Sequence, residues 1–430
     1  MDILLYILGI FAVIVGIALS IGLHELGHYL PAKKFGVRVK QFMVGFGPTV
    51  KSWRSGETEF GFKAIPLGGY ILMTGMYPPE KKPYRGLFSK WINEARAAER
   101  EDILDSDKGR QFYELAPYKK LIIMLGGPVM NLILGTVLLT ITLSGIGVTQ
   151  VSTTIDQVSR CVPATVSAEC QASDVASPAL AAGLKAGDKI LAINGKALES
   201  WSAASDLIKA SVANELRVRS SGGVESTLMI TPVTAQRPVI ENGAVKLDAN
   251  GNPVLGPKPV LGIILASETR ALSLGESLAA SGQSVMQVGQ MILHLPEQVA
   301  AVGQSTFGTE VRKADGPVSV IGIGQIAGEV ASSKTATFEQ KLQSELGILA
   351  SLNFALFAFN LLPLLPLDGG HVAGGIYEAI KKGIFRVLRK PKPGPADTAL
   401  LMPLTWVVFI LLMAMSALII IADFTNPISF

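Results

Sequence analysis

The stretch GLHELGHYL, Gly22–Leu30, places two histidines and a glutamate at the end of an apolar run that begins at Ile3. Within it HELGH, His24–His28, fits the pattern H-E-x-x-H, and on a helix residues four apart share a face. Both imidazoles can therefore reach one metal ion. Zinc suits imidazole nitrogen, and Glu25 is placed to act as general base toward a water beside it. The alternative is a pair of histidines that merely reach the membrane interface from the end of a helix.

The composition favours a membrane protein over one large soluble enzyme. Of 430 residues, 49% are hydrophobic and only 17% are charged, and the apolar residues are concentrated in blocks. Four blocks reach the roughly 20 residues that a spanning helix needs. They are Ile3–Leu23, Leu121–Val148, Leu346–Leu365 and Leu400–Ile421. Ionisable groups in such segments are costly, which favours a functional role for HELGH. A net charge of +4 without a dense basic stripe argues against nucleic-acid binding.

The basic residues predict the orientation. Seventeen Lys and Arg lie between Lys33 and Lys120, and a second basic run covers Lys381–Lys392, so both regions are expected on the cytoplasmic side. Both termini and residues 149–344 would then lie outside the cytoplasm. The two cysteines, Cys161 and Cys170, fall in this middle region, where a disulfide is plausible. The alternative is two free thiols.

Four regions follow along the chain. Residues 1–148 hold two transmembrane helices, a β-hairpin with an apolar face predicted over Thr58–Gly75, and a charged insert at 78–117. We expect residues 149–270 to form an α+β domain outside the cytoplasm. The stretch SPALAAGLKAGDKILAINGKALESW at Ser177–Trp201 resembles part of a PDZ domain. PDZ domains bind extended peptide ends at a sheet edge. Residues 271–344 are an amphipathic helical linker, and residues 345–430 hold two more transmembrane helices. The fold class is a polytopic α-helical membrane protein with four transmembrane helices.

A third metal ligand is expected from NLLPLLPLDGGH, Asn360–His371. The first and third helices run in the same direction on this topology, so their inner ends lie at similar depth. The prolines break the helix, and Gly369 and Gly370 permit close backbone approach. Asp368 and His371 can both ligate a metal, and we favour Asp368. The alternative for Asp368 is a turn aspartate before the glycines.

These motifs together resemble the site-2 protease family. HELGH in a first transmembrane helix, N-x-x-P-x-x-P-x-D-G-G in a late one and a PDZ-like domain between them are most similar to the bacterial regulator-of-sigma-E protease group. Further matching stretches are GFGP (Gly45–Pro48), IPLGGY (Ile65–Tyr70), LGGPVMN (Leu125–Asn131) and GPVSVIGIGQIAG (Gly316–Gly328).

The resemblance implies residue roles. His24, His28 and Asp368 would bind Zn²⁺, and Glu25 would be the catalytic base. Asn360 would hold the substrate backbone. Gly68, Gly69 and Tyr70 belong to a membrane-associated hairpin that would pair with the unwound substrate. The roles of His371 and Asn353 stay open.

The implied function is that of an intramembrane zinc endopeptidase in the bacterial inner membrane, with its active site near the cytoplasmic face. Its partners would be membrane lipid and single-span membrane proteins such as anti-sigma factors, cut after a prior site-1 cleavage. The PDZ-like domain would filter these substrates. One alternative is a non-catalytic, multi-pass scaffold that senses peptides through the PDZ-like domain. Another is a transporter, which predicts inverted repeats that the sequence does not display.

Overall fold

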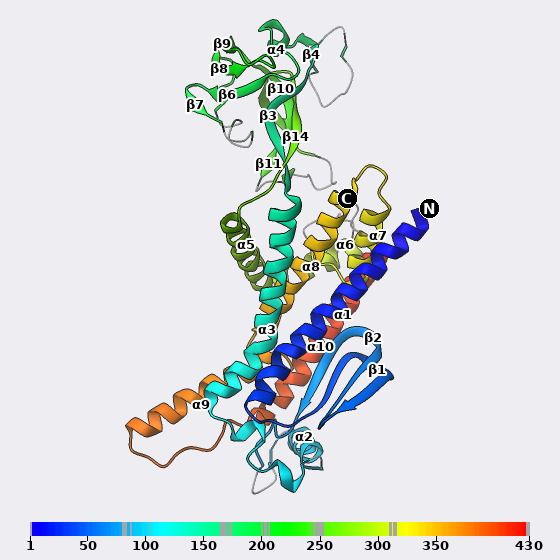
Figure 1. Ribbon diagram of the computed structural model, residues 1–430, viewed down its shortest axis with the longest axis vertical. Helices are drawn as coiled ribbons and strands as arrows, with labels where there is room; N and C mark the ends of the chain where they lie inside the picture. Colours follow the sequence, from blue (N-terminus) through cyan, green and yellow to red (C-terminus); the bar gives the residue numbers. More distant parts are fainter. Residues whose placement is uncertain are drawn as a thin grey trace. The chain divides into compact units, whose positions relative to one another are not determined.

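The chain forms two compact units. The computed structural model describes residues 2–79, 84–86, 88–101, 103–163, 170–171, 174–198, 201, 204, 207–241, 244–245, 253–308, 312 and 316–426. One unit comprises Met1–Ile146 and Ser273–Phe430, and the other comprises Gly147–Leu272. The first is mainly helical and the second mainly β (Figure 1). Parts of the predicted charged insert and PDZ-like stretch, at 80–83, 87, 102 and 199–200, lie outside the described residues.

Within the described residues, four helices are long and apolar enough to cross a membrane. They are built on α1 (Asp2–Lys34), α3 (Pro117–Thr140, extended by a π-helical turn at Ile141–Ile146), α8 (Phe338–Asn360) and α10 (Met402–Thr425, preceded by a 3₁₀ turn at Thr398–Leu401). They correspond to the four predicted segments and make the chain a multi-pass membrane protein.

Two boundaries of these helices differ from the sequence prediction. Helix α1 continues to Lys34, so HELGH lies inside the helix and not at its end. Helix α8 ends at Asn360, before the predicted Leu365, and a separate helix, α9 (Asp368–Val387), begins at Asp368. The prolines at 363 and 366 explain this break, because proline lacks the N–H that a continuing helix requires.

The predicted linker is a set of helices that belongs to the helical unit. Helices α5 (Leu274–Leu293), α6 (Leu295–Phe307) and α7 (Val320–Ser332) occupy it, with residues 309–311 and 313–315 outside the described residues. Helix α7 packs on α1 through small residues. A Cβ on Gly9 would lie 2.6 Å from the Ala327 carbonyl oxygen, and Ala327 is fully buried against Val13 and Ile17. This packing accounts for the small residues of the GPVSVIGIGQIAG stretch.

Strands β1 (Val39–Ser55) and β2 (Thr58–Met73) form a sheet beside the C-terminal half of α1 (Figure 1). Gln41 pairs with both Leu72 and Glu59, so the first part of β1 lies between two parts of β2. The hairpin predicted over Thr58–Gly75 is therefore wrong in its pairing, since these two parts pair with β1 and not with each other. Glycines allow β2 to fold back around β1. Gly68 has φ +126°, and a Cβ there would lie 2.0 Å from the Phe46 ring.

Charged side chains anchor the turn between β1 and β2. Glu57 forms ion pairs with Arg110 at 2.6 Å and with Lys33 at 3.5 Å. Hydrogen bonds from Arg110 lower the pKa of Glu57 to about 2, so the carboxylate stays charged at neutral pH. The sheet is thereby tied both to the end of α1 and to the segment that precedes α3.

The second unit contains a six-stranded sheet in the order β14-β3-β6-β8-β9, with β7 beside β6. The strands are β3 (Val148–Val158), β6 (Lys189–Ile193), β7 (Lys196–Ala197), β8 (Asn214–Arg219), β9 (Glu225–Ile230) and β14 (Ile263–Arg270). Alternating residues of β8, including Leu216 and Val218, face a core that also contains Ile155 and Ile190. The smaller elements are β4 (Cys161–Val162), β5 (Val175–Ala176), α4 (Pro178–Ala181), β10 (Val233–Pro238), β11 (Ile240–Glu241), β12 (Ala244–Val245) and β13 (Leu255–Val260).

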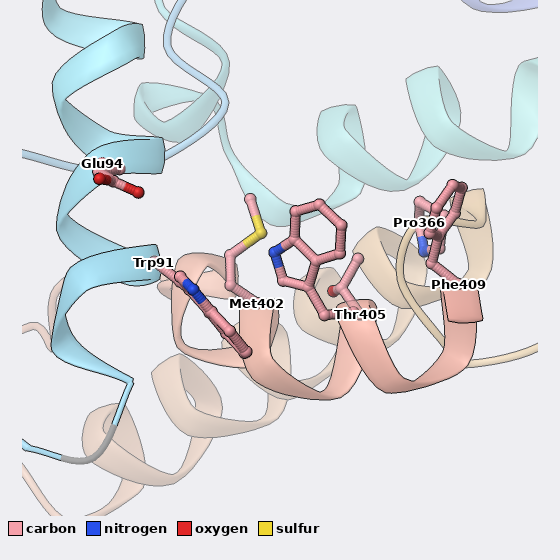
Figure 2. A pocket seen from close by; sticks show the side chains of 7 residues that line it. Trp91, Glu94, Pro366, Met402, Thr405 and Phe409 are labelled. Atoms are coloured by element: carbon pink, nitrogen blue, oxygen red, sulfur yellow. The ribbon is translucent and has the colours of Figure 1, made fainter. Parts of the chain in front are cut away.

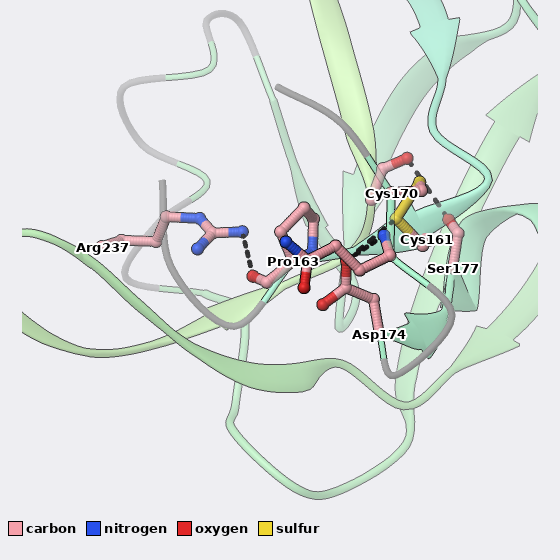
Figure 3. Close-up of a disulfide and its surroundings, with 8 residues drawn as sticks. Cys161, Pro163, Cys170, Asp174, Ser177 and Arg237 are labelled. Carbon is pink, nitrogen blue, oxygen red and sulfur yellow. Dashed lines mark hydrogen bonds between the residues drawn. A yellow bond between two sulfur atoms is a disulfide. The ribbon is translucent and has the colours of Figure 1, made fainter. Parts of the chain in front are cut away.

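The two cysteines of this unit are joined by a disulfide (Figure 3). The Sγ atoms of Cys161 and Cys170 lie 1.98 Å apart and close a short loop. Beside the disulfide, Arg237 on β10 donates a hydrogen bond of 3.1 Å to the Pro163 carbonyl. The disulfide thus closes the loop that follows Cys161, and the hydrogen bond ties Pro163, directly after β4, to β10.

Candidate metal centre

Helices α1 and α3 cross at a contact between glycine backbones. A Cβ on Gly27 would lie 2.2 Å from the Gly126 carbonyl oxygen, and one on Gly126 would lie 2.0 Å from the Gly27 carbonyl oxygen. Only residues without a Cβ permit such an approach. The next residue, Gly127, faces the histidines, since its Cβ would lie 2.2 Å from His28 Nε2. The glycines of HELGH and LGGPVMN thus bring the backbone of α3 against the imidazoles.

His24, His28 and Asp368 converge at this crossing. The two Nε2 atoms lie 3.1 Å apart, and Asp368 Oδ2 lies 3.2 Å from His24 Nε2 and 3.3 Å from His28 Nε2. Both histidines are buried, and Asp368 is the first residue of α9. These three form the one group of potential metal ligands found among the described residues.

The three atoms fit a zinc ion. Ligand atoms about 2.0–2.1 Å from a tetrahedral zinc lie about 3.3 Å from one another, which matches the separations of 3.1, 3.2 and 3.3 Å. Asp368 Oδ2 is buried and has no hydrogen-bond donor among the described residues. Three lone pairs at such distances repel one another unless a cation or protons lie between them. Two imidazoles and a carboxylate, with room for a fourth ligand, are typical of a catalytic zinc site.

Each histidine has a second partner at its other ring nitrogen. His28 Nδ1 lies 2.7 Å from the Ile123 carbonyl oxygen, and His24 Nδ1 lies 3.0 Å from Asn131 Nδ2. Both partners come from α3. Asn131 was not predicted to be a site residue, although an asparagine within an apolar span is a signal that could have identified it.

Glu25 lies between the histidines and the sheet. It is buried, and a Cβ on Gly69 would lie 3.1 Å from its Cγ, so the last part of β2 passes directly against this carboxylate side chain. Gly68 and Tyr70 flank Gly69, and the Tyr70 hydroxyl donates to Gln41 Oε1 at 3.2 Å. Of the three predicted β2 residues, the structure thus places Gly69 directly against Glu25, whereas Gly68 packs against the Phe46 ring.

The remaining candidates, Asn360 and His371, lie on the two helices that flank the turn before Asp368. Asn360 is the last residue of α8 and is half-buried. His371 lies outside the ligand group, with its ring edge-on to Phe112 at 6.5 Å. It lines a small polar cavity together with Lys120 and Glu378, whose ion pair of 2.7 Å is almost fully buried. This pair ties α9, which carries Asp368, to α3.

Asn353 packs helices together. It is fully buried, and its Nδ2 donates to Ser20 Oγ at 2.9 Å and to the Leu349 carbonyl at 2.8 Å. Ser20 belongs to α1, so this hydrogen bond joins α8 to α1 within the helical unit. Neither of these hydrogen bonds reaches His24, His28 or Asp368.

An apolar cavity of about 440 Å³ lies close to the turn that precedes Asp368 (Figure 2). Trp91 and Glu94 line it from α2 (Ser89–Glu101), and Pro366 lines it from the turn. Met402, Thr405, Trp406 and Phe409 of α10 complete the lining. The described part of the predicted solvated insert is therefore not wholly exposed, because α2 packs Trp91 against Trp406 at 6.2 Å between ring centroids and buries Ile92.

Comparison with known proteins agrees with this geometry. A model of peptidase family M50 matches residues 12–390. The zinc metalloprotease Rip1 of Mycobacterium tuberculosis is 29% identical over 99% of both chains, and Rip1 of Mycolicibacterium smegmatis is 28% identical over 98%. The metalloprotease MmpA of Caulobacter vibrioides is 28% identical over 86% of both chains. Because the match spans HELGH, the crossing glycines and Asp368, the chain belongs to peptidase family M50, the site-2 proteases, and is a zinc metalloendopeptidase.

Proposed function

We propose that this protein hydrolyses peptide bonds in or near the transmembrane segment of single-span membrane proteins, with His24, His28 and Asp368 as zinc ligands. The observation that carries the proposal is the convergence of these side chains, from two distant parts of the sequence, with separations of 3.1–3.3 Å. They lie on helices of the membrane-spanning unit, so the reaction would take place at membrane depth.

Glu25 is the proposed general base. Zinc bound by the three ligands would polarise the attacked carbonyl and lower the pKa of water. Glu25 directly follows His24, lies three residues before His28 and is buried, so its carboxylate can take a proton from water and return it to the leaving amine. Its low-dielectric surroundings strengthen each of these electrostatic interactions.

The backbone of β2 at Gly68, Gly69 and Tyr70 would hold the substrate. A transmembrane helix satisfies its peptide groups internally, so it must be unwound and its backbone paired elsewhere before hydrolysis. The register of β2 supports this role, because the pairs Val44–Gly69 and Met43–Tyr70 leave the opposite edge of this part of β2 without a strand partner among the described residues. An extended peptide can add to such an edge. Asn360, at the end of α8, would bind the same backbone.

The β unit would act as a PDZ-like filter outside the cytoplasm. Its GLKAGD turn, with Gly183 and Gly187 at φ +83° and +88°, leads into β6 as expected of the resemblance. The Cys161–Cys170 disulfide favours an oxidising compartment. Such a filter suits a protease of the bacterial inner membrane that acts after a prior site-1 cut, for example on anti-sigma factors, with its active site near the cytoplasmic face.

A reconstituted cleavage assay tests this function. Wild type and Glu25→Gln are placed in liposomes with a single-span substrate whose outer domain is either present or truncated, and zinc is measured in both proteins. We expect wild type alone to cleave, faster on the truncated substrate, and both proteins to hold one zinc. Cleavage by Glu25→Gln, or a wild type that cleaves after complete removal of zinc, would contradict the proposal.

A further inference from the structure

Asn131 is a fully buried polar side chain in an apolar helix. It lies on α3, one turn after Gly127, and its exposed fraction is 0%. Its amide nitrogen is 3.0 Å from His24 Nδ1, and its Oδ1 has no hydrogen-bond partner among the described residues. Burying an amide at membrane depth is costly unless the amide is hydrogen-bonded. The contact with His24 is the one hydrogen bond of this amide that the structure describes.

The hydrogen bonding of His28 shows which protonation His24 needs in order to bind a metal. A histidine that binds a metal through Nε2 must carry its proton on Nδ1. His28 satisfies this condition because its Nδ1 lies 2.7 Å from the Ile123 carbonyl oxygen, which can only accept a hydrogen bond. His24 Nε2 faces His28 Nε2 and Asp368 Oδ2 at 3.1 and 3.2 Å, so it needs an acceptor at Nδ1 in the same way.

The amide of Asn131 can supply that acceptor. An asparagine amide has nearly the same shape after a rotation of 180° that exchanges Oδ1 with Nδ2, and its orientation is assigned from the hydrogen-bond network. In the orientation described, Oδ1 has no donor among the described residues, and exchanging the two atoms places it opposite His24 Nδ1, so the protonation of His24 decides between the two orientations. A metal-binding His24 has an N–H at Nδ1, and this N–H requires Oδ1 opposite it.

We propose that Asn131 is a positioning residue, whose Oδ1 accepts a hydrogen bond from His24 Nδ1–H and so aims the Nε2 lone pair at the zinc site. The proposal rests on the proposed ligand role of His24. Partners of metal-binding histidines fix both the tautomer and the ring orientation, and their loss costs about 10–100-fold in metal affinity. Since Asn131 and Gly127 lie on one face of α3, this helix contributes both the space for the histidines and their hydrogen bonds.

Zinc affinity of the full-length protein in detergent tests this role without any substrate. Affinity is measured by competition with a chelator for wild type, Asn131→Ala, Asn131→Asp and His24→Ala, with thermal unfolding of each zinc-free protein alongside. We expect Asn131→Ala to bind zinc about 10–100-fold more weakly. Asn131→Asp keeps an acceptor for Nδ1–H, so we expect its affinity within a few-fold of wild type.

Asn353→Ala is the matched control. Asn353 is equally buried in a neighbouring helix, but its amide bonds Ser20 and the backbone instead of a metal-site histidine. We expect this variant to lose folding stability and to keep its zinc affinity. The positioning role is overturned if Asn131→Ala binds zinc as tightly as wild type, if Asn131→Asp is as weak as Asn131→Ala, or if Asn353→Ala is weakened equally. Wild-type affinity in His24→Ala would instead overturn the ligand assignment itself.

Discussion

Substitution of Gly127 by alanine should remove zinc from a protein that still folds. A Cβ at this position would lie 2.2 Å from His28 Nε2 and 2.7 Å from His24 Nε2. Ordinary van der Waals contact begins near 3.4 Å, so His28 must retreat by about 1.2 Å. Zinc–ligand distances tolerate only about ±0.2 Å, and the retreat therefore removes at least one ligand. We expect zinc affinity to fall by more than the roughly 100-fold that loss of an indirect partner causes.

The effect on folding should be small by comparison. Overpacking costs about 1–3 kcal/mol, whereas the change from glycine to alanine inside a helix contributes about 1 kcal/mol in its favour. The zinc-free variant should thus lose no more than about 2 kcal/mol of its free energy of unfolding. Gly282→Ala is the control, because Gly282 also lies inside a helix, α5, and no atom lies within 4 Å of its added Cβ.

The assay is zinc content and chelator competition on purified Gly127→Ala, Gly282→Ala and wild type, with thermal unfolding of the zinc-free proteins. Gly282→Ala should match wild type in zinc affinity. Stoichiometric zinc of wild-type affinity in Gly127→Ala would refute the placement of the histidines against α3.

Three further predictions concern other parts of the molecule. His371→Ala should keep full zinc content while Asp368→Ala loses it, as measured by elemental analysis, since His371 lies outside the ligand group; the reverse result would reassign the third ligand. Lys120→Met should lower the free energy of unfolding by about 1.5–3 kcal/mol, because Glu378 would lose one buried charged partner while keeping its ion pair with Lys382. Lys108→Met, which breaks an exposed pair, should leave thermal unfolding unchanged. Reduction of the Cys161–Cys170 disulfide should lower the stability of the β unit by about 2–3 kcal/mol in denaturant titrations, and no change on reduction would show that the loop is held by other contacts.

Much of the helical architecture could be predicted from the sequence. Length and hydropathy predicted four spans, and four helices of spanning length and composition are present among the described residues. The pair His24 and His28 follows from helical periodicity, and the proline-broken stretch before Asp368 indicated where a third ligand could approach. Each of these predictions depends on residues that lie close together in the sequence, so one sequence is enough to make it.

What could not be predicted depends on contacts between distant segments. The hairpin predicted within Thr58–Gly75 was wrong because alternation indicates strands without identifying their partners, and both parts of this segment pair with β1. The separate helix α9 was missed because the basic stretch after Asp368 was considered only for its charge. The contact between Asn131 and His24 could not be predicted, because it depends on the crossing of Gly27 and Gly126 that brings α3 against His24.

X-ray absorption at the zinc edge of the purified protein tests the central claim most directly. We predict one zinc per chain with two imidazole ligands and further oxygen ligands at about 2.0–2.2 Å in wild type, and loss of this zinc signal in His28→Ala. A spectrum with sulfur ligands, or an identical spectrum for wild type and His28→Ala, would contradict it.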